Sequence, residues 1–202
     1  MALITAAEAR DYLPSLSGTG EDTTLDRFIA RAGAMMAAWC GYPPASAGAT
    51  PTLEDVTHIH YLDGPGGRDL LLRVTPVVSI TSLYDDPDRV WAAATLVAAA
   101  DYTLLDGERG QVLLTSTATH GVWNEGRGFI KATYVAGFAT IPDDLKGICA
   151  ELVKHLWSRR TLQGKTSVTA SGAQVSKEAD NHGIPAHIRA ELGRFRLPGT
   201  ML

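Results

Sequence analysis

Three helix-forming segments enclose a long stretch of chain that has the pattern of β-strands, and this order constrains the fold more than any other feature of the sequence. We predict helices over residues 5–13, 22–40 and 142–159, where apolar residues recur at spacings of three and four. Residues 56–136 show strand-like runs separated by turn clusters. The order predicts an α+β fold: a small helical bundle with an inserted antiparallel β-rich region and an extended C-terminal segment.

The ends of the predicted helices carry start and stop signals. Thr5 and Glu8 have the spacing of a capping box, in which each side chain binds the backbone amide of the other. One of the residues 22–24 can cap the second helix, and Gly41 can end it in a left-handed conformation. Pro142 suits the first position of the third helix. Each predicted helix therefore has at least one end marked by a residue that suits the backbone conformation or hydrogen bonding of that end.

Turn clusters divide the β-rich region into strands. Strands are predicted at residues 76–84 and 129–135. Residues 90–100 fit either a strand pair or a short helix. Two hairpins are also predicted, each formed by two strand-like runs across a glycine-containing turn: 58–62 with 70–74, and 102–105 with 111–114.

The charge is unevenly distributed along the chain. The formal net charge is -4, but residues 1–149 carry 10 Lys and Arg against 18 Asp and Glu, whereas residues 150–202 carry 8 against 4. A basic segment of this kind is either a solvated tail or a part that meets an acidic partner, protein or nucleic acid. Residues 161–181 are polar and rich in Gly, Ser and Thr, so we expect them to be loose. We therefore predict a body over residues 1–160 and a flexible C-terminal segment over residues 161–202 that ends in a short helix.

The cysteines and the first residues indicate the compartment. Cys40 and Cys149 each lie on an apolar helix face without metal-type spacing, so we expect reduced thiols in the core. Residues 1–4 lack the basic and apolar pattern of a signal peptide, and no apolar run approaches the length of a membrane span. We therefore expect no membrane partner and a cytosol-like compartment.

Two clusters of residues could hold a metal, and both have a simpler structural interpretation. Asp85, Asp86 and Asp88 offer the carboxylates that a hard cation requires, but a solvated turn that ends a strand is favoured. His58 and His60 alternate along a strand and share one face, but they have no third ligand at a diagnostic spacing. A polar sheet face is the favoured interpretation, and we predict no bound metal.

Other candidate sites are weaker. The glycine-rich runs 64–67 and 126–128 lie beside strands, whereas phosphate-binding loops lie between a strand and a helix. No serine has the motif of a nucleophile elbow. We therefore predict no catalytic residue and no cofactor. Trp91 and Trp123 lie outside the helical stripes and are the predicted interface aromatics.

Short motifs follow one another in a characteristic order along the chain. They are the opening helix Leu3–Leu13, the turn Trp39–Gly41, the turn Tyr61–Gly64 with the strands Asp69–Arg73 and Pro76–Ile80, the stretch Tyr134–Phe138 and the helix start Ile141–Lys146. In order and spacing, this set resembles the head-tail connector (adaptor) family of long-tailed bacteriophages and gene transfer agents. Residues 90–100 and 161–181 depart from the family's pattern.

The resemblance implies a structural virion protein and not an enzyme. It implies a homo-oligomeric, dodecameric ring at the head-tail junction, assembled in the host cytoplasm. The implied partners are the portal protein, a tail or head-closure protein, other copies of the chain, and DNA that passes through the channel without sequence specificity. An acidic body suits such a channel, because phosphate binding depends on Lys and Arg. A helical body beside a sheet also offers the two dissimilar surfaces that a head-to-tail ring requires.

The C-terminal segment is the predicted portal-docking site, because it joins a net positive charge to a short amphipathic helix. The alternative is a helix folded back on its own body. Two other classes stay open: a small metal-dependent enzyme that uses the Asp and His clusters, and a nucleic-acid-binding module that uses the basic segment. The predicted docking residues are Ile188, Arg189, Leu192, Arg194, Phe195 and Arg196.

Overall fold

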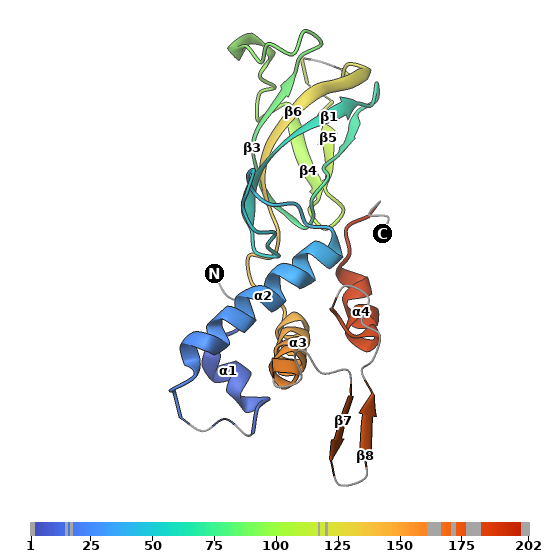
Figure 1. The fold of residues 1–202 in the computed structure, drawn as a ribbon. Coiled ribbons are helices and arrows are strands. Elements are labelled where there is room, and N and C mark those ends of the chain that lie inside the picture. The colour runs from blue at the N-terminus through green and yellow to red at the C-terminus, as the bar shows by residue number, and fades with distance from the viewer. Residues whose placement is uncertain are drawn as a thin grey trace. The chain divides into compact units, whose positions relative to one another are not determined.

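The chain divides into two units, one mainly of helices and one of strands, in the computed structural model (Figure 1). The helical unit is Met1–Pro43 with Ile141–Leu202, and the β-rich unit is Pro44–Thr140. The predicted α+β class is confirmed. The division differs from the expected one, because the C-terminal helix belongs to the helical unit. The structure describes residues 3–14, 16, 18–116, 118–119, 121–160, 167–170, 173–176 and 183–198.

The helical unit contains the three predicted helices. They are α1 (Ala6–Asp11), α2 (Asp22–Cys40) and α3 (Asp143–Arg159). The predicted terminal helix is also present, as α4 (Ala186–Leu192) and a 3-10 turn over Gly193–Phe195. Strands β7 (Ser167–Ala170) and β8 (Ala173–Ser176) form an antiparallel hairpin within the segment expected to be loose; the rest of that expectation falls on residues outside the described part.

The predicted helix ends are confirmed at two of the signals. The Thr5 amide donates to Glu8 Oε2 at 2.7 Å and the Glu8 amide donates to Thr5 Oγ1 at 3.2 Å, which is the capping box. Gly41 ends α2 with φ 85°. Pro142, predicted at the first helical position, instead occupies the N-cap position of α3. The predicted cap of α2 is wrong. Glu21 is the N-cap residue of α2 and makes no side-chain hydrogen bond there. Asp22 instead forms an ion pair with Arg10, with Oδ2 3.6 Å from Nη2.

The apolar stripes of α1, α2 and α3 form the core of the helical unit. Cys40 and Cys149 are free and buried, as expected, and burial raises the pKa of both thiols to about 12. Phe28 of α2 packs edge-on against Trp157 of α3, with ring centroids 5.4 Å apart. The fully buried side chains of this core include Ile29, Met36, Leu145 and Leu152.

Among the helices of the described residues, none combines the length and apolar character needed to cross a membrane.

Two three-stranded antiparallel sheets build the β-rich unit (Figure 1). One sheet has the order β1-β6-β3, formed by Val56–Gly64, Gly126–Ala136 and Val77–Asp85. The other has the order β2-β5-β4, formed by Asp69–Leu71, Gln111–Leu114 and Tyr102–Asp106.

Only one of the two predicted hairpins is correct. β4 and β5 pair as expected, but β1 pairs with β6 and β2 pairs with β5. The turn at residues 63–67 therefore joins two sheets instead of two partners. β2 has three residues, whereas β6 offers the nine-residue β1 a partner of matching length. Residues 90–100 form neither a strand pair nor an α-helix, but a 3-10 turn at Ala93–Thr95 and one bridge between Tyr84 and Leu96.

The inner faces of the two sheets share one core. Trp123, predicted at an interface, is instead fully buried in it, and its Nε1 donates to the carbonyl of Arg68 at 3.1 Å. An indole that is buried with its N–H satisfied is a packing residue. The other fully buried members of this core include Leu83, Val112, Leu114, Ile130 and Tyr134.

Candidate interaction surfaces

The acidic run at the end of β3 organises the loop that follows it. Asp85 and Asp86 are buried, so the expected solvated turn is wrong for both residues. The Asp86 carboxylate accepts the amides of Asp88 at 3.0 Å, Val90 at 3.0 Å and Trp91 at 2.7 Å, and the Thr95 hydroxyl at 3.4 Å. Burial raises the pKa of Asp86, but these hydrogen bonds outweigh it, and the pKa lies below its usual value.

This loop presents an aromatic side chain outward at a cost in backbone strain. Arg89 and Trp91 have φ of 57° and 59°, a region that non-glycine residues rarely adopt. Each such residue costs on the order of 1–3 kcal/mol and persists because its surroundings hold it. The Asp86 hydrogen bonds supply that support. As a result, the Trp91 ring lies against Tyr61 of β1, with centroids 5.4 Å apart.

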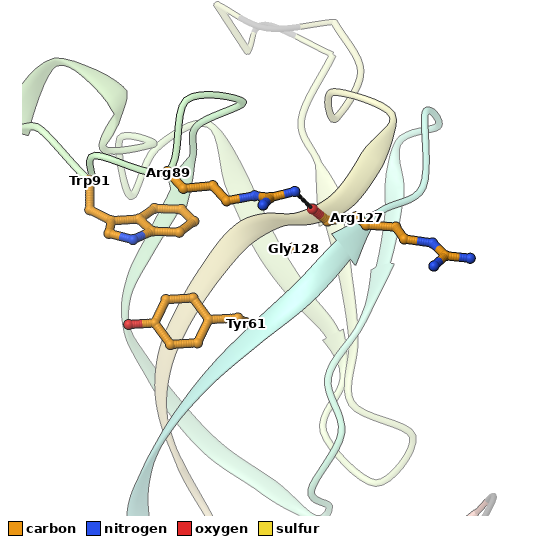
Figure 2. A pocket seen from close by; sticks show the side chains of 5 residues that line it. All are labelled: Tyr61, Arg89, Trp91, Arg127 and Gly128. Atoms are coloured by element: carbon orange, nitrogen blue, oxygen red, sulfur yellow. Dashed lines mark hydrogen bonds between the residues drawn. The ribbon is translucent and has the colours of Figure 1, made fainter.

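An open depression of about 530 Å³ lies over β1, the start of β6 and this loop (Figure 2). Tyr61, Arg89, Trp91, Arg127 and Gly128 line it. Figure 2 shows the two rings facing each other while Arg89 reaches across to the Arg127 carbonyl, which accepts from its Nη2 at 2.6 Å. The Arg127 side chain points away from the rings (Figure 2). Rings and guanidinium groups of this kind suit contacts with apolar and anionic groups.

The two histidines predicted to share a face do so inside the β-rich unit. His58 is 2% exposed, and its ring stacks on that of His60 with centroids 5.5 Å apart. The Tyr134 hydroxyl accepts the Val74 amide at 3.0 Å and lies 2.9 Å from His60 Nδ1, and the tautomer of the ring decides which of the two donates. Among the described residues, no three His, Cys, Asp or Glu side chains could hold one metal ion. The pair is part of the core.

The buried histidines should make the β-rich unit less stable at acidic pH. Burial lowers the pKa of both rings, and the neighbouring charges of His58 and Arg73 help to lower that of His60 to about 4. A base with a depressed folded pKa contributes stability above its unfolded pKa of about 6.5, which is lost as the pH falls toward the folded value. A His60→Gln variant should therefore lose less stability between pH 7 and pH 5 than the unmodified protein, as measured by urea unfolding. An unchanged pH dependence would contradict this.

The predicted docking residues lie on α4 and the turn after it, and two of the six, Ile188 and Leu192, are turned inward. Ile188 and Leu192 are 1% and 0% exposed and pack against α2 and α3. The Leu197 amide donates to the Cys40 carbonyl at 2.9 Å, which fixes the end of the segment to α2. This arrangement corresponds to the alternative interpretation, a helix folded on its own body. The apolar side of the helix is thus occupied in the chain itself.

The cations of the same segment lie nearer the surface. The guanidinium groups of Arg189 and Arg196 lie 5.6 and 5.4 Å from the Trp39 ring centroid. Arg194 Nη2 lies 2.8 Å from Asp144 Oδ2, and its side chain is 57% exposed. Its guanidinium also lies 4.8 Å from the ring centroid of Phe195, which is half-buried. Contact with a partner through these groups stays a prediction.

Sequence reasoning missed the depression, although one signal was present. Tyr61 alternates with His58 and His60 along β1, so it lies on the opposite face of that strand. The sequence predicts Trp91 as an interface aromatic, but no residue near it in the sequence indicates Tyr61 as its partner. Their meeting depends on the path of the loop after β3, which the buried Asp86 determines.

Comparison with known proteins gives two matches. A sequence model of the family described as head completion protein matches residues 2–197. A solved chain from the neck of an empty GTA particle, determined with C6 symmetry, has the same fold with a TM-score of 0.57. It is 20% identical, and the alignment covers 98% of this chain and 92% of that one. Among curated proteins, none matches the chain.

Proposed function

Because the chain belongs to the head completion protein family, we propose that it is the adaptor that joins the portal to the tail in a tailed phage or gene transfer agent. As a member of this family it is a structural protein of the virion, at the junction of head and tail. The observation that carries the proposal is the extent of the family match, which spans residues 2–197 and so includes both units. If the chain shared only one domain with the family, the match would cover only one of the two units.

The proposed adaptor works as a ring. The fold likeness to a chain of a neck with C6 symmetry supports cyclic assembly, and the dodecameric state stays a prediction. DNA would pass through the ring without sequence-specific contact. Such passage requires a channel that does not hold phosphate groups, and the chain's net charge of -4 is consistent with this requirement.

Portal docking is proposed for the outward side of the C-terminal segment. Since Ile188 and Leu192 are buried in the chain's own core, the contact would use Arg194, the docking residue whose side chain is exposed. A guanidinium at the rim of a contact steers association with an acidic partner surface. Its pair with Asp144 is exposed, so exchange of one partner for another has a low cost, about 0–1 kcal/mol.

A particle-completion assay tests this proposal. Heads assembled without this chain should remain tailless, and addition of the purified protein should restore tail attachment, counted by electron microscopy. An Arg194→Glu variant should stay folded and attach several-fold less well. An Asp144→Asn variant breaks the same surface pair but keeps the cation, so it should attach normally. Heads that acquire tails without the protein would refute the adaptor role, and normal attachment of Arg194→Glu would refute docking through Arg194.

A further inference from the structure

Exposed apolar side chains are concentrated on the β-rich unit. Of the nine large apolar side chains that are exposed among the described residues, eight belong to residues 44–140. An apolar surface of this kind on a folded unit marks a contact with another protein. The most exposed of them on the strands and their loops are Val90, Leu71, Tyr61, Leu105 and Ile59, at 73%, 65%, 60%, 57% and 56%.

One group of these side chains lies on the outer face of the sheet β1-β6-β3, here called the aromatic face. Tyr61 and Ile59 project from β1, and Trp91 packs on Tyr61. The register places Lys131 of β6 beside Tyr61, and the Arg127 guanidinium lies at the rim without a partner among the described residues. The bordering carboxylates are few, and one of them, Asp63, accepts the Gly128 amide at 2.8 Å. The aromatic face is thus apolar and cationic.

The other group lies on the outer face of the sheet β2-β5-β4, here called the acidic face. Leu71 projects from β2 next to Asp69, whose Oδ1 accepts from Gln111 Nε2 at 2.8 Å. Leu105 lies in a bulge at the end of β4. Both cations beside these carboxylates are engaged: Arg109 Nε lies 3.6 Å from Asp106 Oδ2, and Arg68, just before β2, donates to the Leu114 carbonyl. The acidic side chains of this face are Asp69, Asp106 and Glu108.

The two faces complement each other. Each combines exposed aliphatic or aromatic side chains with charges of one predominant sign, and the signs are opposite. Because the inner faces of the sheets share one core, the outer faces point away from each other on the same unit. A unit with two unlike, complementary faces on opposite sides makes head-to-tail contacts, and in a ring of many copies the two contact faces of each copy are nearly opposite.

We infer that neighbouring copies of this chain meet with the aromatic face of one β-rich unit on the acidic face of the next. The partner is therefore a second copy of the same chain. This inference rests on the proposed function, since it names the contact that closes the proposed ring. Opposite charges at the rim would set the orientation of the two copies. Contact between two aromatic faces or between two acidic faces would be disfavoured, because like charges would then meet.

Cysteine cross-linking in completed particles tests the inference. Tyr61→Cys with Leu71→Cys introduces one thiol on each face at exposed positions, and the native Cys40 and Cys149 are fully buried. A short bifunctional maleimide should then link many copies into a ladder on a denaturing gel. Either substitution alone should give only uncross-linked chains. In a head-to-tail contact, a residue of one copy does not meet the same residue of the neighbouring copy.

A second pair and a functional control make the outcomes separable. Ile59→Cys with Leu105→Cys should give the same ladder from neighbouring positions. Absence of a ladder from both pairs in completed particles, or dimers from a single substitution, would overturn the inference while the adaptor role stands. If the unmodified protein does not complete heads at all, the proposed function fails instead.

Discussion

Replacement of Leu152 by Asp is expected to unfold the helical unit. Leu152 lies on α3, is 0% exposed and belongs to the core that α3 shares with α2. An aspartate there would leave a charge without a partner in an apolar environment, a change that costs roughly 3–5 kcal/mol or more. Small domains are stable by only about 5–15 kcal/mol. The variant should therefore be largely unfolded or insoluble at 37 °C.

Circular dichroism and urea unfolding check this expectation, with Ala30→Asp as the matched control. Ala30 is an exposed position in the middle of α2, so the same carboxylate there remains in water. The control should lose less than about 1 kcal/mol, mainly through helix propensity. A Leu152→Asp protein that is soluble and retains its full helical signal would refute the common core of α2 and α3.

Deletion of residues 184–202 is expected to destabilise the isolated protein. The segment buries Ile184, Ile188, Leu192 and Leu197, each 7% exposed or less. Full burial of such side chains contributes roughly 1.5–3 kcal/mol each. The backbone entropy of ordering the segment offsets a large part of this gain, so the net loss should be roughly 2–4 kcal/mol. The deletion also exposes the surface of α2 on which α4 lies.

Thermal unfolding of the truncated chain measures this effect. A midpoint lowered by roughly 5–15 °C is expected. Arg194→Glu, which leaves the buried side chains in place, should lower it by a few degrees at most, because exposed ion pairs contribute little. A truncated protein with an unchanged midpoint would contradict the packing of α4 on the helical unit and would support a segment that is free to dock elsewhere.

The helices could be predicted from the sequence because their signals are local. The capping box at Thr5 and Glu8, the left-handed Gly41 and the spacing of apolar residues all act within a few positions of the chain. Strand pairing depends on residues that are far apart, and a turn cluster reports only that the chain bends. Residues 63–67 bend it between sheets, and the pairing of Tyr61 with Lys131 has no local signal.

The interaction surfaces were predicted only in part, for a related reason. The amphipathic pattern of residues 184–196 correctly indicates an apolar face but does not say whether the chain itself or a partner covers it. Asp86 resembles a turn residue in sequence, whereas in the fold it is buried and holds the strained loop that carries Trp91. The exposed leucines of the acidic face carry no sequence signal that separates them from core leucines.

Cryo-electron microscopy of particle necks can show whether copies of this chain form the ring between the portal and the tail. Reconstruction of necks from particles that carry the unmodified protein should show a closed ring of copies of this chain, with both of its units resolved, between the portal and the first tail component. Necks in which this position is occupied by another protein, or particles that complete normally and contain no copy of this chain, would refute the adaptor role.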